Sequence, residues 1–312
     1  MVISSVLVVA GLVLLTFGGD VLTTGAAGMA YRLGIRPVVV GLTVVAFGTS
    51  LPEGFVSIVA SFSGSADIAI ANVIGSNLFN IGVVMGVAAL IRPLKVEKGS
   101  IRREVPFLVG SALLLWLLAA DGRLGRGDGA ILTVLFVAFL WTCFRKAAAE
   151  DGAAEESSQA PPGSRRRNTL KIVLGLLLLA AGSKLLVSGA IDIARTLGVS
   201  ELLIGITIVA AGTSLPELAA SVMASLKGHD DIAVGNIVGS GIFNILFVLG
   251  CASLIHPLSV NALILSRDVW VMAGFSLAVV PIMRSGFVIS RKEGALLFMC
   301  YLIYAGFLVK AG

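Results

Sequence analysis

Long apolar stretches, separated by short polar segments, organise the whole chain. Ten of them approach or exceed the roughly 20 residues that a helix needs to cross a bilayer. We therefore expect an all-α membrane protein with ten transmembrane helices. The predicted spans are residues 2–31, 36–62, 67–91, 105–120, 129–145, 169–195, 201–225, 231–255, 268–284 and 292–310.

The first half of the pattern returns in the second half after a shift of 164 residues. Residues 41–94 align with residues 205–258 without a gap and share 30 identities in 54 positions. Because five spans per copy is an odd number, the second copy starts from the opposite side of the membrane. The prediction is two inverted five-helix repeats, 1–146 and 168–312, joined by a flexible cytoplasmic linker of low-complexity sequence, 147–167.

One hexapeptide, GTSLPE, interrupts the apolar pattern at residues 48–53 and again at 212–217. A carboxylate in the middle of a membrane span costs several kcal/mol, roughly 2.5–3.5 on insertion scales. No Lys or Arg lies in the surrounding ranges 37–91 and 196–226, so nothing nearby in sequence neutralises either Glu. Two such costly residues in equivalent positions indicate a functional site.

A proline in each hexapeptide interrupts the helix. Pro52 cannot donate a hydrogen bond to the carbonyl of Gly48, and its ring clashes there. Broken backbone at membrane depth is tolerated only where it is buried in protein or lines a polar cavity. Freed carbonyls, hydroxyls and a carboxylate are hard oxygen ligands for a small cation. We expect broken helices around one central cation site to which both motifs contribute.

The span after each motif carries a second polar segment. In the first repeat Ser76 and Asn80 are four residues apart and share one helix face, and residues 236–244 repeat the pattern. Gly75 and Gly239 are expected to let neighbouring backbones approach closely. The alternative for these hydroxyls and amides is that they only hold helices together.

Two further charges lie inside the first and sixth spans. Asp20 and Lys184 occupy equivalent positions in the two repeats. Because neither lies in a broken helix, we expect structural roles, either by pairing with each other or by capping nearby polar groups. The same two spans carry regularly placed glycines, so we also expect them to slide over the site as a gate.

Composition confirms the membrane class and sets the orientation. Hydrophobic residues make up 57% of the 312 residues, charged residues make up 13%, and mean hydropathy is +1.01. A soluble domain would have about 25% charged residues. With the N-terminus outside, 17 of the 23 Lys and Arg fall on the inner side, so both termini are predicted outside a multi-pass cell (inner) membrane protein.

Other function classes find little support in the residues. The three cysteines lie apart, so neither a disulfide framework nor a cysteine metal site is indicated. No His-Glu metal motif or Ser/Lys pair at helical spacing occurs, so we expect no enzyme, no cofactor and no nucleic-acid partner. A cation channel would need a continuous pore, usually built by symmetric subunits. The internal inverted repeat and the enclosed site with two Glu favour alternating access instead, and we expect a monomer in the lipid bilayer.

The paired GTSLPE segments, each followed by GS-x-x-x-N, closely resemble the α-repeats of the sodium/calcium exchanger family in the cation/Ca²⁺ antiporter superfamily, of prokaryotic type. The resemblance implies a secondary active antiporter that exchanges Na⁺ for Ca²⁺ by alternating access, with electrogenic transport. A proton-coupled Ca²⁺ antiporter remains the alternative. The site residues that the resemblance implies are Ala46, Thr49, Ser50, Glu53, Ser76, Asn80, Ala210, Thr213, Ser214, Glu217, Ser240 and Asn244.

One position departs from the pattern of some family members, which carry Asp where Asn244 stands. The site then has two carboxylates rather than three, which argues against potassium dependence.

Overall fold

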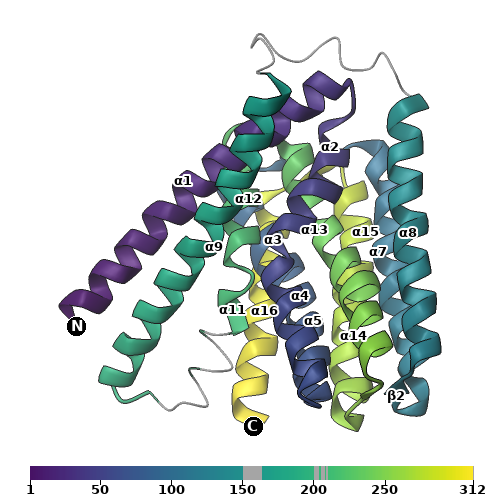
Figure 1. The fold of residues 1–312 in the computed structure, drawn as a ribbon. Helices are drawn as coiled ribbons and strands as arrows, with labels where there is room; N and C mark the ends of the chain where they lie inside the picture. The colour runs from purple at the N-terminus through teal and green to yellow at the C-terminus, as the bar shows by residue number, and fades with distance from the viewer. Residues whose placement is uncertain (150–163, 200–203, 205–207, 209, 312) are drawn as a thin grey trace.

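The structure is a computed structural model that describes residues 1–149, 164–199, 204, 208 and 210–311 (Figure 1). It is a bundle of helices. The α-helices are α1 (Val2–Leu33), α2 (Pro37–Val40), α3 (Ala46–Thr49), α4 (Leu51–Phe62), α5 (Ala66–Phe79), α6 (Gly86–Ile91), α7 (Lys98–Leu118), α8 (Arg126–Ala149), α9 (Arg165–Thr196), α11 (Ala210–Gly212), α12 (Leu215–Leu226), α13 (Asp230–Ile242), α14 (Leu249–Ile255), α15 (Val269–Arg284) and α16 (Arg291–Ala311).

Eight helices in the described ranges are long and apolar enough to cross a membrane. A ninth crossing results if the bent pair Pro37–Thr49 and Leu51–Phe62 counts as one span. The predicted span 201–225 includes residues outside the described ones, and within it α12 has only 12 residues. The spans therefore agree with the predicted ones except at the seventh, where the described helices do not reach the length of a crossing.

The fourth span begins earlier than the apolar pattern predicts. The prediction started it at residue 105, whereas α7 begins at Lys98. Its first two turns contain Arg102, Arg103 and Glu104. Long charged side chains can cover apolar surface with their stems while their charged ends reach water, so a helix continues past the end of its apolar run.

Among the residues that the structure describes, four short π-helical segments interrupt or join the spans, and the sequence pattern did not predict them. They are η1 (Gly41–Val45), η2 (Asn80–Met85), η5 (Phe243–Val248) and η6 (Ile264–Asp268), alongside one 3₁₀ turn, η3 (Ala119–Asp121). Segment η2 joins α5 to α6, and η5 joins α13 to α14. Isolated π turns inside α-helices are uncommon and occur often at functional sites.

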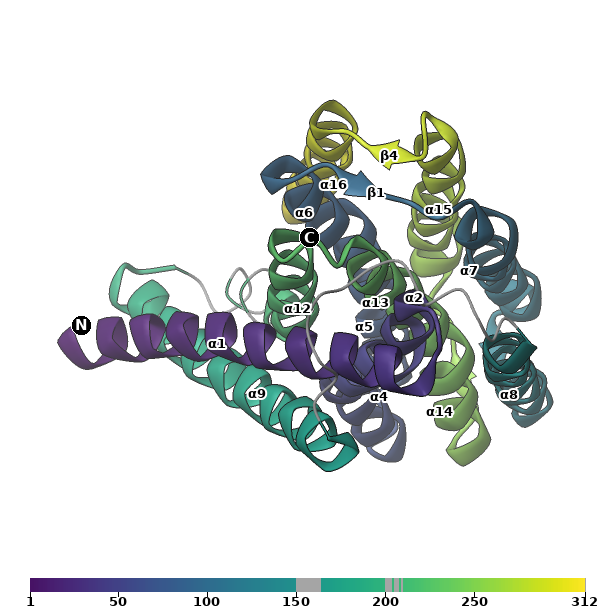
Figure 2. The same cartoon turned by 90° about the horizontal axis from the view of Figure 1, so that it is seen from above.

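The two continuous spans α5–η2–α6 and α13–η5–α14 form the centre of the bundle. Within their most apolar windows 78% and 83% of the residues are buried, against 28% in α1 and in α9. Helix α13 packs against α2, η1 and α3. Seen from above, these elements lie between the α1–α9 pair and the outer helices α7, α8, α15 and α16 (Figure 2). The polar segments of the sequence thus lie where lipid does not reach.

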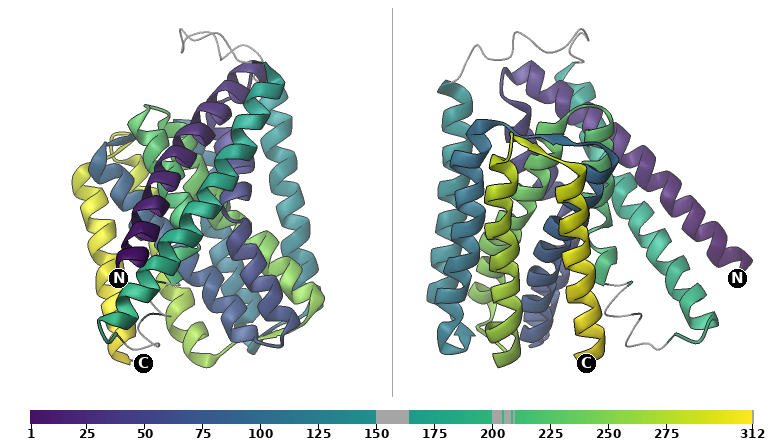
Figure 3. Two further views of the ribbon diagram at one scale, coloured as in Figure 1. Left: turned by 60° about the vertical axis from the view of Figure 1, so that its left-hand side comes forward. Right: turned by 180° about the vertical axis from the view of Figure 1, so that it is seen from behind.

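Helices α1 and α9 pack along each other and lean away from the rest of the bundle (Figures 1 and 3). Small residues allow the contact: a Cβ on Gly11 would lie 2.6 Å from the amide nitrogen of Leu186, and one on Gly182 would lie 2.8 Å from that of Leu15. The regularly placed glycines therefore form a close contact between α1 and α9, which was not among the predictions from the sequence.

Two short antiparallel ladders tie the halves of the chain together. Strand β1 (Leu94–Lys95) pairs with β4 (Val288–Ile289), and β2 (Arg123–Leu124) pairs with β3 (Leu258–Ser259). Each ladder joins a loop of the first half to a loop of the second.

Asp20 is an ion-pair partner of Lys227, not of Lys184. Its Oδ1 lies 2.6 Å from Nζ of Lys227, which also donates to Oγ1 of Thr24 at 2.6 Å. Lys184 is exposed on α9. The structural role expected for Asp20 thus takes the form of a link between α1 and the end of α12.

The close approach expected at two glycines is confirmed at one. A Cβ on Gly239 would lie 2.5 Å from the carbonyl oxygen of Leu42, whereas at Gly75 no described atom would lie within 4 Å. The ends of the predicted linker 147–167 are helical, because α8 runs to Ala149 and α9 starts at Arg165. Residues 150–163 lie outside the described residues.

Candidate cation site

The first GTSLPE motif bends its span at Ser50. Helix α3 ends at Thr49 and α4 begins at Leu51. The span bends by 48° between these two halves. Ser50 has φ −85° and ψ 6°, outside the helical region, and Pro52 lies in the first turn of α4. This is the break that the proline predicted, and it places Glu53 in the first turn of a new helix at 0% exposure.

The second motif has nearly the same backbone. Ser214 has φ −92° and ψ 8° between α11 and α12, and Glu217 lies in the first turn of α12, also at 0% exposure. Because a helix start presents amide groups and a positive dipole end, a carboxylate in the first turn is favourably placed. The two motifs thus position their carboxylates by the same local device.

The motifs are joined by two crossed hydrogen bonds. Oγ of Ser50 donates to Oε1 of Glu217 at 2.7 Å, and Oγ of Ser214 donates to Oε1 of Glu53 at 2.8 Å. All four residues are 0% exposed. Each serine thus satisfies one oxygen of the carboxylate that belongs to the other motif.

The second oxygen of each carboxylate has no hydrogen-bond partner, and several neighbouring candidate residues share this property. Nine of the thirteen buried side-chain atoms without a hydrogen-bond partner in the described residues belong to the predicted site. Buried polar atoms are normally satisfied, because leaving them unpaired costs free energy. These nine atoms are Oε2 of Glu53 and Glu217, Oγ of Ser76 and Ser240, Oγ1 of Thr213, and Oδ1 and Nδ2 of Asn80 and Asn244.

The two amides of this set lie at the π-helical segments. Asn80 begins η2, and Asn244 is the second residue of η5. Helix α12, with Glu217, contacts η2, while α4, with Glu53, contacts η5. Each glutamate helix therefore packs against the asparagine segment of the other half of the chain.

Thr49 and the two alanines complete the predicted set. Oγ1 of Thr49 donates to the carbonyl of Val45 at 3.1 Å and lies 3.1 Å from Oδ1 of Asn236. The carbonyl of Ala46 accepts from the amide of Ser50 at 3.1 Å, so it is already used within its helix. Ala210 begins α11.

Asn72 supports the first motif from the neighbouring helix, and sequence reasoning did not single it out. Its Nδ2 donates to the carbonyl of Glu53 at 3.0 Å and to Oγ of Ser57 at 2.9 Å. The amide thereby fixes the first turn of α4 against α5.

Asn236 does the same for the second motif. Its Nδ2 donates to the carbonyl of Glu217 at 3.4 Å and to Oγ of Ser221 at 2.9 Å. Its Oδ1 meets Thr49 of the first motif, so Asn236 also connects the two breaks. The signal that could have found both asparagines is their identity at equivalent repeat positions.

The chemistry of the arrangement suits a cation. Two carboxylates are buried together without an ion-pair partner among the described residues, and the surrounding unpaired atoms are mostly hydroxyl and amide oxygens. No group of three or more His, Cys, Asp and Glu suited to a metal occurs in the described part of the chain, and the other unpaired buried atoms here belong to neutral hydroxyls and amides. Oxygen ligands are those that Ca²⁺ prefers.

Comparison with known proteins gives consistent results. The family model for "Sodium/calcium exchanger protein" matches residues 3–145 and again residues 168–310. The chain is 44% identical to a putative antiporter, CaxA, of Alkalimonas amylolytica, over 97% of this chain and 98% of that protein. It is 36% identical to the sodium/calcium exchanger MaX1 of Methanosarcina acetivorans, over 94% of this chain and 95% of that protein.

A solved structure shares the fold. The sodium-calcium exchanger NCX_Mj, soaked with zero Na⁺ and Ca²⁺, superposes with a TM-score of 0.86 at 31% identity, covering 98% of this chain and 99% of that one.

Proposed function

Because this chain belongs to the sodium/calcium exchanger family, we propose that it exchanges Na⁺ for Ca²⁺ across the membrane by alternating access. It is a multi-pass, helical membrane protein and a cation/Ca²⁺ antiporter, not an enzyme. Ca²⁺ and Na⁺ are transported ions, and no cofactor is needed.

The observation that carries the proposal is the pair of crossed bonds between Ser50 and Glu217 and between Ser214 and Glu53. They hold two carboxylates together while leaving one oxygen of each unpaired. Two like charges buried together repel unless a cation lies between them. One Ca²⁺ would cancel their charge and would be replaced on exchange by Na⁺ ions.

The proposed ligand set extends beyond the two glutamates. The unpaired hydroxyls and amides of Ser76, Ser240, Asn80, Asn244 and Thr213 supply neutral oxygens. The remaining members are proposed as ligands through carbonyl or hydroxyl oxygens, and those among them that already form hydrogen bonds exchange partners when an ion binds. These remaining members are Ala46, Thr49, Ser50, Ala210 and Ser214.

We also propose the architecture predicted from the sequence: ten spans in two inverted repeats, residues 1–146 and 168–312, with 147–167 as a cytoplasmic linker. The separate family matches to residues 3–145 and 168–310 support this division. The near-identical backbone at Ser50 and Ser214 supports it too. Both termini lie in the lower half of the view in Figure 1, the N-terminus at the tip of the leaning α1 and the C-terminus at the foot of α16, which supports the proposed topology with both outside an inner membrane.

The test is uptake of radioactive calcium into proteoliposomes that contain the purified protein. Uptake should follow an outward Na⁺ gradient, saturate with external Ca²⁺ and vanish when Na⁺ is equal on both sides. A proton gradient imposed alone should drive no uptake. Uptake driven by protons and indifferent to Na⁺ would replace the proposal with a proton-coupled antiporter, and unsaturable flux without a counter-ion would indicate a channel.

A further inference from the structure

The proline of the second motif leaves a backbone carbonyl without its usual helical donor, and another helix supplies one. Pro216 has no amide hydrogen to donate to the carbonyl of Gly212, four residues earlier. Oγ of Ser183, on α9, donates to that carbonyl at 2.6 Å. Ser183 is only 8% exposed and Gly212 is buried, so this bond lies inside the protein. Helix α9 thus replaces the hydrogen bond that the break removes.

The two repeats differ at this contact. The shift of 164 residues places Gly19 of α1 where α9 has Ser183, and glycine has no hydroxyl to donate. A Cβ on Gly19 would lie 2.8 Å from the carbonyl oxygen of Ala219 in α12, so this position faces a regular helix rather than a break. The asymmetry exists although the two breaks have nearly the same backbone.

Helix α9 lies against both breaks but meets them with different chemistry. A Cβ on Gly48 would lie 2.5 Å from Cδ1 of Leu176, and one on Gly212 would lie 2.5 Å from Cγ2 of Val187. At the first break the neighbouring side chain of α9 is therefore apolar. At the second break α9 also carries Ser183, so its position is tied to that motif by a hydrogen bond.

We propose that Ser183 is a positioning residue of the cation site, which it serves through the carbonyl of Gly212 without touching the ion. This inference rests on the proposed function. The next two residues, Thr213 and Ser214, both belong to the proposed ligand set. Oγ1 of Thr213 is buried and unpaired, and Oγ of Ser214 donates to Oε1 of Glu53. Because a peptide unit is planar, fixing the carbonyl of Gly212 also fixes the start of this turn and restricts where the two hydroxyls point.

Calcium binding to the purified full-length protein, measured by isothermal titration calorimetry, tests the proposal. Ser183→Ala should raise the dissociation constant for Ca²⁺ about threefold to tenfold, the range expected for one neutral hydrogen bond. Ser183→Thr keeps the hydroxyl and should bind Ca²⁺ as tightly as the parent. A hydroxyl between membrane helices can also serve packing alone. In that case Ser183→Ala would have a lower melting temperature but an unchanged dissociation constant, and the proposal would be wrong.

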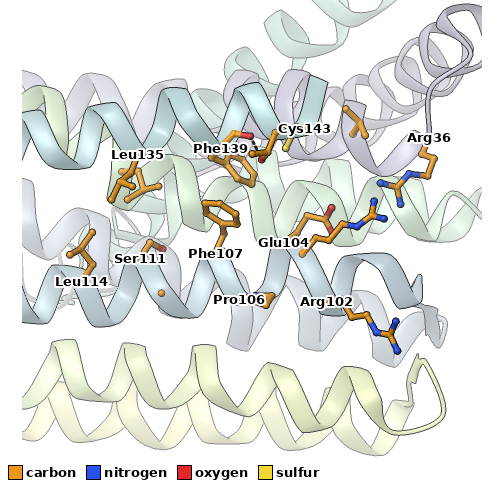
Figure 4. A pocket seen from close by; sticks show the side chains of 15 residues that line it. Arg36, Arg102, Glu104, Pro106, Phe107, Ser111, Leu114, Leu135, Phe139 and Cys143 are labelled. Carbon is orange, nitrogen blue, oxygen red and sulfur yellow. Dashed lines mark hydrogen bonds between the residues drawn. The ribbon is translucent and has the colours of Figure 1, made fainter. Parts of the chain in front are cut away.

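Ser111→Ala is the matched control. Ser111 is a buried serine of α7 at 4% exposure, and its Oγ donates to the carbonyl of Leu108 in its own helix at 2.8 Å. It lines a cavity of about 500 Å³ between α7 and α8, and the described residues around this cavity include none of the proposed ligands (Figure 4). This variant should bind Ca²⁺ like the parent. An equal loss of affinity in Ser111→Ala and Ser183→Ala would contradict the proposal.

A double variant tests the route through the turn. Because Ser183 and Ser214 act on one segment, Ser183→Ala/Ser214→Ala should lose less affinity than the product of the two single losses. Independent effects would overturn this route and the proposal with it. For a variant that is obtained in small amounts, the rise in melting temperature on adding Ca²⁺ replaces calorimetry, because a ligand of the folded state stabilises it.

The parent protein separates this inference from the proposed function. A parent that binds no Ca²⁺ would overturn the proposed function and this inference together. A parent that binds Ca²⁺, with the same dissociation constant in Ser183→Ala, would overturn this inference alone.

Discussion

Oγ of Ser50 lies 2.7 Å from Oε1 of Glu217, across a sequence separation of 167 residues. The reciprocal bond joins Ser214 to Glu53 at 2.8 Å. Neither carboxylate is held by its own motif alone. The two halves of the chain therefore have to be assembled before either glutamate is in place, and a change in one motif acts on the carboxylate of the other.

Replacing Glu53 or Glu217 by Gln should abolish calcium transport. An amide supplies no negative charge, and removing one partner of a buried charged group costs about 3–5 kcal/mol, or at least roughly 100-fold in affinity. Calcium uptake into proteoliposomes measures the effect, with Asp121→Asn in an exposed turn as the control. Near-normal exchange in either variant would show that the carboxylates are not ligands.

Removing the crossed hydrogen bonds should weaken calcium binding without removing it. Hydrogen bonds to charged groups contribute about 1.5–3 kcal/mol, so Ser50→Ala and Ser214→Ala should each lower the apparent affinity for Ca²⁺ by about 10- to 100-fold. Ser63→Ala is the control, because its hydroxyl bonds only the carbonyl of Val59 at an exposed position. The concentration dependence of uptake is the measurement. A similar effect in the control would refute the argument.

Asn72→Leu and Asn236→Leu should each raise the half-saturating Ca²⁺ concentration on the order of tenfold. Each substitution removes the buried hydrogen bonds that the asparagine amide makes, so the two effects should be similar. Both asparagines act through the backbone of a glutamate, so they are positioning residues. Asn77→Leu is the comparison, because Nδ2 of Asn77 bonds the carbonyl of Val73 in its own helix. If properly folded Asn72→Leu protein has an unchanged half-saturating Ca²⁺ concentration, Asn72 does not position the site and its role is purely structural.

A reversible crosslink between α1 and α12 should stop exchange. Asp20 and Lys227 are in contact across these helices, so cysteines in their places lie within reach of a short bifunctional thiol reagent. The native cysteines are first replaced by alanine. If α1 slides over the site as a gate, transport should cease on crosslinking and return on reduction. Continued exchange by fully crosslinked protein would exclude this movement.

Exchange should generate a membrane current. Two carboxylates balance one Ca²⁺, whereas three Na⁺ ions would carry one charge more through the same site. Moving one charge across 100 mV is worth about 2.3 kcal/mol. A potassium diffusion potential imposed with valinomycin should therefore accelerate or slow calcium uptake according to its sign. Uptake that ignores the potential would favour a two-for-one exchange.

The sequence by itself determined the fold class, an all-α membrane protein, and predicted the repeat and the position of the site. Those conclusions followed from local physics: apolar length sets the spans, a proline in a span breaks its helix, and a carboxylate in lipid is too costly to keep without a use. The equivalence of Glu53 and Glu217 could be read from the shift of 164 residues, because the second copy repeats the motif unchanged.

The tertiary structure decided which groups serve that site. Ser50 bonds Glu217 rather than Glu53. Asp20 pairs with Lys227 rather than with Lys184. Asn72 and Asn236 bond the backbone carbonyls of the two glutamates. Such pairings depend on how helices cross and rotate about their axes, which sequence spacing within one helix does not specify. The π-helical segments, such as the one that begins at Asn80, were likewise not predicted from the sequence.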